Sequence, residues 1–64
     1  MLLNQKLSAI LTQKGISKYK LAKLTGMPYT TIYELINGKN KSPSFEAVVK
    51  IANALEIQLT ELIN

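Results

Sequence analysis

Glycine ends three successive helix-like segments of this 64-residue chain. The positions of these glycines constrain the fold more than any other feature of the sequence. Gly15, Gly26 and Gly38 each stand just past a run of apolar residues at helical spacing. Glycine closes many helices in this position, because it takes up left-handed backbone angles without a steric penalty. No segment shows the alternation of apolar and polar residues that marks a strand. The sequence therefore predicts an all-α fold made of short helices.

Five helices are predicted from these glycines, from the spacing of apolar residues and from two serines that suit the first position of a helix. Ser17 and Ser44 are good N-caps, since a serine hydroxyl accepts hydrogen bonds from the free N–H groups of a first turn. Met27-Pro28 opens the third helix, where proline is well tolerated. The predicted helices span residues 3–14, 18–25, about 28–37 and 45–55, followed by a short last helix with Leu59, Leu62 and Ile63.

The apolar positions of these helices form the predicted core. They are Leu3, Leu7, Ile10, Leu11, Leu21, Ala22, Ile32, Leu35, Phe45, Val48, Ile51, Ala52 and Leu55. The connections are short, and only the polar loop 38–43 has any length, which indicates a compact single domain over residues 1–64. A chain of this length buries only about 60% of its unfolded surface, so efficient helices or a partner subunit must add stability.

The charge of the chain is unevenly distributed. The net charge is +4, and all eight basic residues are lysines. Residues 1–43 contain seven lysines and one glutamate, which gives +6, whereas residues 44–64 contain one lysine and three glutamates, which gives −2. A basic front half favours a polyanionic partner such as a nucleic acid. Ordinary solvated lysines would give the same total, so the charge alone leaves both interpretations open.

Several kinds of chemistry lack the residues that they require. Cysteine and histidine are absent, which removes disulfides, thiolate metal sites and the commonest general base. The four glutamates are scattered and have no such partners, so we expect no enzyme activity, no metal and no cofactor. Polar residues follow directly after Leu3, and no stretch approaches the ~20 apolar residues of a membrane span. The default expectation is a cytoplasmic protein.

The most informative segment is 17–38, with the sequence SKYKLAKLTGMPYTTIYELING. Two short helices meet there at Gly26, and the small side chain of Ala22 lets them approach closely. The outer face of the second helix carries Tyr29, Thr30, Tyr33 and Glu34. An exposed helix of this kind fits the major groove of DNA, which is about 12 Å wide.

The whole chain resembles the phage repressor and Cro-type helix-turn-helix domain, the XRE family. The resemblance covers residues 3–63, and it rests on Leu21-Ala22, Gly26, Ile32, Asn37-Gly38, Pro43-Ser44 and the closing run KIANALEIQLTEL. It implies a lambda-repressor-like fold in which the second and third helices form the helix-turn-helix. It also implies a small transcriptional regulator, a repressor of phage, plasmid or mobile-element type that acts in a prokaryotic cell or a phage-infected host.

The resemblance implies roles for individual residues. Base contacts fall to Tyr29, Thr30 and Tyr33, with Thr31 and Glu34 at the edge, and phosphate contacts fall to Lys18, Lys39, Asn40 and Lys41. The chain has no arginine, so the common arginine–guanine contact is excluded, and we expect a site that leans towards A·T pairs. Two interpretations of Tyr19, on the second helix, remain open. It packs on the protein surface, which we favour, or it contacts DNA.

The sequence departs from the family pattern in three ways, which involve four positions. Pro28 stands where many relatives have serine or threonine, and its missing N–H removes one possible phosphate donor. Leu11 and Ile36 occupy the positions of a salt bridge that the family commonly buries, and an apolar pair can replace such a bridge without loss of stability. Glu56 stands where glycine is usual, and left-handed geometry there would cost on the order of 1 kcal/mol.

Relatives of this type bind inverted repeats as two-fold dimers, with recognition helices about 34 Å apart. We therefore expect a homodimer on double-stranded DNA. The candidate interface residues lie at the apolar C-terminal end and are Ile57, Leu59 and Ile63. An alternative of another class is an antitoxin-like or adaptor module that uses the same fold to hold a protein partner, to which Leu24 and the apolar C-terminal end would contribute.

Overall fold

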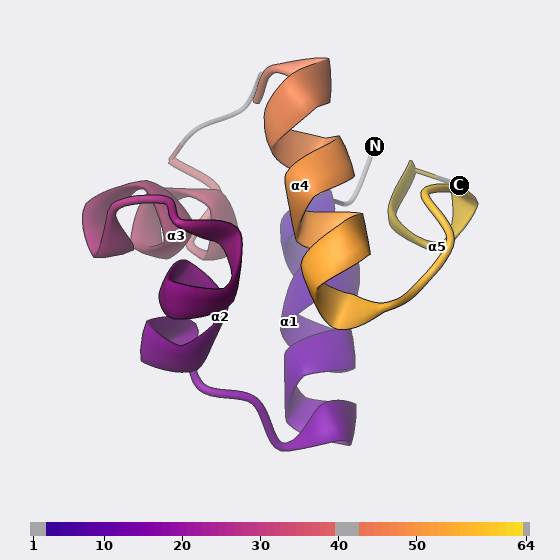
Figure 1. The fold of residues 1–64 in the computed structure, drawn as a ribbon, viewed down its shortest axis with the longest axis horizontal. Coiled ribbons are helices and arrows are strands. Elements are labelled where there is room, and N and C mark those ends of the chain that lie inside the picture. The colour runs from indigo at the N-terminus through magenta and orange to yellow at the C-terminus, as the bar shows by residue number, and fades with distance from the viewer. Residues whose placement is uncertain (1–2, 40–42, 64) are drawn as a thin grey trace.

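The computed structural model describes residues 3–39 and 43–63 (Figure 1). Its helices are α1 Leu3–Lys14, α2 Lys18–Thr25, α3 Tyr29–Ile36, α4 Phe45–Leu55 and α5 Thr60–Ile63. Within these two ranges there is no strand, so the predicted all-α fold of five helices is confirmed. No helix in the same ranges is both long enough and apolar enough to cross a membrane.

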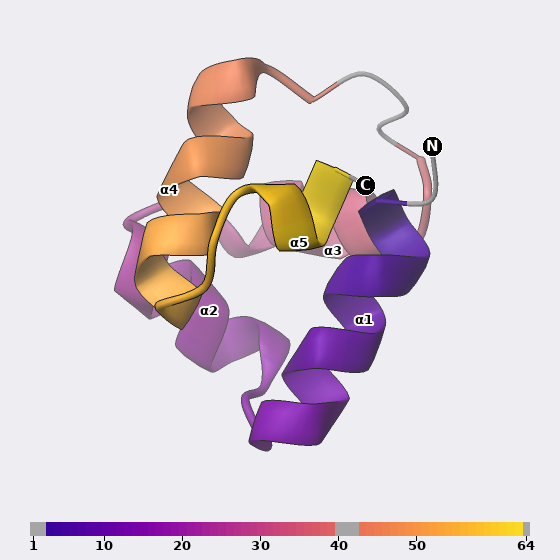
Figure 2. The same cartoon turned by 90° about the vertical axis from the view of Figure 1, so that its right-hand side faces the viewer.

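The helices α2 and α3 lie together on one side of α1 and α4, and α5 lies on the other (Figure 1). Figure 2 shows α5 crossing the face between α4 and α1. The pairs that pack are α1 with α3, α2 with α3, α2 with α4, and α1 with α5. The helix α3 thus packs against two helices, α1 and α2.

One apolar core joins all five helices. Its buried members are Leu3, Leu7, Leu11, Leu21, Ile32, Leu35, Val48, Ile51, Ala52, Leu55 and Leu62. Full burial of each large aliphatic side chain contributes about 1.5–3 kcal/mol of hydrophobic free energy. The predicted core is confirmed at ten of these positions, and the predicted members Ile10 and Ala22 pack against it partly buried.

The prediction that Phe45 faces the core is wrong, because 69% of its surface is exposed. Phe45 is the first residue of α4, whereas the first buried residue of that helix is Val48, three residues later. Spacing alone continued the apolar stripe one turn too far towards the N-terminus.

Hydrogen bonds at the helix ends explain why the helices begin where they do. The Ser17 hydroxyl accepts from the backbone N–H of Lys20 at 3.0 Å, and the Ser44 hydroxyl accepts from that of Ala47 at 3.1 Å. Both predicted N-caps are therefore confirmed. Pro28 is itself the N-cap of α3, with φ −60° and ψ 143°, so this helix begins one residue later than predicted.

Glu56 adopts the left-handed conformation, with φ 57° and ψ 43°, at the C-cap of α4. The chain then turns sharply, and the backbone N–H of Ile57 donates to the carbonyl of Ala52 at 3.0 Å. A side chain with a β-carbon is strained in this conformation by about 1–2 kcal/mol relative to glycine. The left-handed geometry that the resemblance implies at this position is therefore present at Glu56, without the glycine.

Leu11 and Ile36 both belong to the apolar interior. Leu11 is 5% exposed, and Ile36 packs partly buried against the same core. Among the described residues no buried side-chain nitrogen or oxygen lacks a hydrogen bond. Hydrocarbon side chains therefore fill the two positions at which the resemblance implies a buried salt bridge.

Candidate nucleic-acid interface

The turn between α2 and α3 is fixed by Thr25 and Gly26. The Thr25 hydroxyl donates to the carbonyl of Leu21 at 2.9 Å and accepts from the backbone N–H of Met27 at 3.2 Å. Gly26 has φ 74° and ψ 14°, and its N–H donates to the carbonyl of Ala22 at 2.9 Å. A β-carbon at Gly26 would meet no atom within 4 Å, so glycine is required for its backbone angles and not for space. These contacts set the direction in which α3 leaves the turn.

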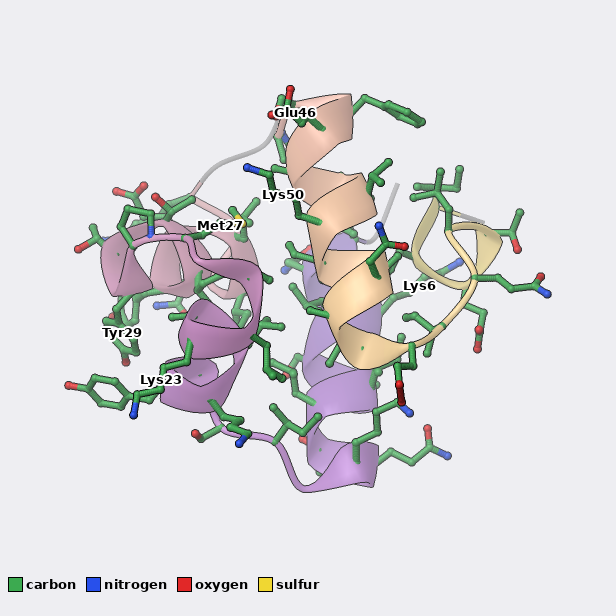
Figure 3. All side chains as sticks on the ribbon, in the orientation of Figure 1. Lys6, Lys23, Met27, Tyr29, Glu46 and Lys50 are labelled. Atoms are coloured by element: carbon green, nitrogen blue, oxygen red, sulfur yellow. The ribbon has the colours of Figure 1, made fainter. Side chains whose placement is uncertain are left out.

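The two faces of α3 differ sharply in burial. Ile32 and Leu35 are 0% and 1% exposed, so the inner face is locked into the core. Tyr29 and Tyr33 are 37% and 38% exposed, and Thr30 is exposed beside them. Figure 3 shows Tyr29 on the side of the helix pair that faces away from α1 and α4. Of the other residues predicted to read bases, Thr31 and Glu34 are half-buried.

Three tyrosines from two helices form a continuous aromatic surface, the tyrosine row of Tyr19, Tyr29 and Tyr33. The rings of Tyr19 and Tyr29 are stacked, with centroids 4.5 Å apart and planes 23° apart. The rings of Tyr29 and Tyr33 are tilted by 37°, with centroids 6.3 Å apart. Tyr29 and Tyr33 are one helical turn apart, so their spacing in the sequence already predicts that they are neighbours. The place of Tyr19 beside them depends on how α2 crosses α3, and no sequence pattern signals it.

Two lysines lie over the tyrosine row at Tyr33. The Nζ atom of Lys18 is 5.2 Å from the centroid of that ring, and the Nζ atom of Lys39 is 5.9 Å from it. Ammonium groups within about 6 Å of an aromatic centroid are attracted to the ring. The fold thus brings two of the predicted phosphate-contacting lysines to the predicted base-reading residues. The other two residues predicted to contact phosphates, Asn40 and Lys41, lie outside the described residues.

The chemistry of this surface suits a ligand that offers both flat apolar groups and negative charge. Tyrosine rings contact apolar groups such as thymine methyls, and their hydroxyls donate and accept hydrogen bonds. The neighbouring ammonium groups supply the charge that phosphates attract. Among the described residues no three His, Cys, Asp or Glu side chains gather as a metal site would require.

The candidate dimer residues at the other end of the chain differ in exposure. Ile57 and Leu59 pack partly buried against the core, whereas Ile63 is 39% exposed. Much of the apolar surface of the first two residues is therefore used within the chain itself. Ile63 is the most exposed of the three residues.

A comparison with protein families matches the chain to the Cro/C1-type HTH DNA-binding domain over residues 6–64. No curated protein matches the chain. The matched range contains the Thr25–Gly26 turn, all of α3 and the tyrosine row, and it agrees with the resemblance found in the sequence. Fold, site and family match thus agree on one conclusion, which is that this chain belongs to the family of Cro/C1-type helix-turn-helix DNA-binding domains.

Proposed function

We propose that the protein is a small transcriptional regulator, a repressor of phage, plasmid or mobile-element type, that reads double-stranded DNA by sequence. The observation that carries the proposal is the division of α3 into a locked inner face and an exposed outer face. Ile32 and Leu35 fix the helix, while Tyr29, Thr30 and Tyr33 remain exposed. A rigid helix that presents such side chains is what major-groove reading requires.

In this proposal the lysines position the protein and α3 reads the bases. Contacts to phosphates carry no sequence information but fix the register of a protein on the duplex. Lys18 and Lys39 would make these contacts, since their ammonium groups lie 5.2 Å and 5.9 Å from the ring of Tyr33. Tyrosine and threonine at the base edges favour thymine methyls, so the proposed site leans towards A·T pairs.

The proposed binding unit is a homodimer on an inverted repeat. A domain of 64 residues has too small a surface to reach the affinity of typical specific complexes alone, and a second copy doubles the contacts. Ile63 and the half-buried Ile57 and Leu59 are the proposed interface. Analytical ultracentrifugation with a single operator duplex should find two chains per duplex. One chain per duplex at saturation would reject the dimer.

Selection of binding sites from random duplex DNA at two salt concentrations tests the proposed function. An enriched inverted repeat with half-sites about one helical turn apart supports a dimeric sequence reader. Binding that falls steeply with salt but enriches no sequence would reject sequence reading, because phosphate contacts alone produce that behaviour.

A second candidate function, the holding of a protein partner, is favoured by one observation. An open groove of about 550 Å³ runs between the ends of α1, α2 and α4, and it is lined by Lys14, Ile16, Leu24, Asn53, Ala54, Leu55 and Glu56. Leu24 is 46% exposed there. An antitoxin-like or adaptor module would bind a partner tightly there and bind DNA weakly, so Leu24→Ala would weaken partner capture and leave DNA binding unchanged.

A further inference from the structure

Tyr19 lies outside the helix that carries the predicted reading residues, yet it belongs to the same surface. It is 69% exposed, and its ring stacks on that of Tyr29 with 4.5 Å between the centroids. An exposed tyrosine of α2 is thus in contact with the first residue of α3.

The place of Tyr29 in its helix explains why such a contact matters. Long side chains on a helix lie back over the preceding turn, which limits the orientations open to them. Tyr29 is the first residue of α3 and follows Pro28, whose backbone is extended, so α3 has no preceding turn to support its ring. Tyr33 lies one turn later and has the ring of Tyr29 beside it at 6.3 Å. The ring of Tyr19 stacks on that of Tyr29 at the start of α3, where no helical turn precedes Tyr29.

We propose that Tyr19 is a positioning residue, which holds the ring of Tyr29 in the orientation in which Tyr29 reads one base pair. This inference rests on the proposed sequence-specific function. A side chain that is ordered before binding loses less conformational entropy on binding, and a fixed ring discriminates more sharply between bases than a mobile one. The ring of Tyr19 is sufficient for this role, and its hydroxyl is not required.

The test compares wild type, Tyr19→Ala and Tyr19→Phe on an enriched duplex and on the set of its single-base-pair variants. At the base pair whose discrimination is lost in Tyr29→Ala, Tyr19→Ala should reduce discrimination about 2- to 10-fold, which corresponds to an aromatic stack of ordinary strength. Tyr19→Phe should keep wild-type discrimination, because it keeps the stack. Leu24→Ala is the matched control, since it truncates another exposed side chain of α2 that lines the groove beside α1 and α4.

The double variant Tyr19→Ala/Tyr29→Ala separates positioning from direct contact. If Tyr19 acts through Tyr29, the double variant discriminates at that base pair no less than Tyr29→Ala alone. Additive losses would overturn the positioning role, because Tyr19 would then contact DNA by itself. The positioning role would also be overturned if wild type discriminates at that base pair and Tyr19→Ala discriminates there equally well.

A measurement on the free protein keeps this inference distinguishable from the proposed function. The Hα–Hβ couplings of Tyr29 report whether its side chain occupies one rotamer or several. Wild type and Tyr19→Phe should show one rotamer, and Tyr19→Ala should show averaged couplings. Averaged couplings in wild type would overturn the positioning role without any DNA. A wild type that binds all duplexes equally would reject the proposed function, and the specificity role of Tyr19 with it.

Discussion

The hydroxyl of Thr25 accepts a hydrogen bond from the backbone N–H of Met27 at 3.2 Å, across the turn that joins α2 to α3. The same hydroxyl donates to the carbonyls of Leu21 at 2.9 Å and Ala22 at 3.2 Å. One side chain therefore binds the last turn of α2 to the start of the segment that leads into α3. The direction of the proposed reading helix depends on this small network.

Thr25→Val should lower the free energy of unfolding by about 1–2 kcal/mol, because the nearly isosteric valine leaves the Met27 N–H without its acceptor. Urea denaturation followed by circular dichroism measures this change. Thr12→Val is the matched control, since Thr12 lies on the exposed face of α1, and its effect should stay within about 0.5 kcal/mol. Equal losses for the two variants would contradict the role given to the Thr25 hydroxyl.

Glu56→Gly should stabilise the protein by about 1 kcal/mol, because glycine takes up the left-handed conformation without the strain of a β-carbon. For a domain of this size the melting temperature would rise by about 4–8 °C. Thermal denaturation provides the measurement.

Glu56→Ala separates the backbone effect from the charge of the side chain. Alanine removes the carboxylate but keeps the β-carbon, so it should give little of the stabilisation that glycine gives. If alanine stabilises as much as glycine, the charge of Glu56 and not its φ of 57° is the cause.

The fold could be predicted from the sequence because residues close to each helix end determine where that helix begins or ends. Ser17, Ser44 and Gly26 act through their own backbone or side chain within a few residues, so they can be read without knowledge of the rest of the chain. Phe45 shows where this fails. Helical spacing gives the face on which a residue lies, but whether the core reaches that point of the helix depends on the packing of the other helices.

The candidate site was predictable within α3 and not across the helix pair. Tyr29 and Tyr33 share a face by their spacing alone. The stack of Tyr29 on Tyr19 and the approach of two lysines to Tyr33 depend on the angle between α2 and α3. That angle results from the turn at Thr25 and from the core, which no short sequence pattern encodes.

Tyr33→Ala should weaken binding to an enriched duplex by roughly 1–3 kcal/mol and relax the preference at one base pair. The reason is that the proposed reading face would lose a ring and a hydroxyl together. Titrations with the enriched duplex and with random duplex, at one salt concentration, measure the two affinities. The account of Tyr33 as a base-reading residue is rejected by equal losses on both duplexes.

Lys39→Gln should weaken binding to all duplexes alike and reduce the salt dependence of the binding constant by about one phosphate contact. Lys41→Ala should do the same, although Lys41 lies outside the described residues. Affinity measured over a series of salt concentrations gives the slope.

Lys6→Gln is the control for these lysine variants. It removes the same charge from the chain, but Figure 3 shows Lys6 on the side of α1 next to α5, away from Tyr29. Its salt slope should match that of wild type. A fall of equal size for Lys6→Gln and Lys39→Gln would mean that only the net charge of the chain attracts DNA.

The outer face of α3 is the surface proposed to read base edges. The most direct measurement is the detection of NMR cross-relaxation between the tyrosine ring protons and an enriched duplex. If α3 reads bases, Tyr29 and Tyr33 should show contacts to major-groove base protons, with thymine methyls among them. Contacts to sugar protons alone, or contacts that involve α5 and leave α3 unaffected, would contradict this proposal.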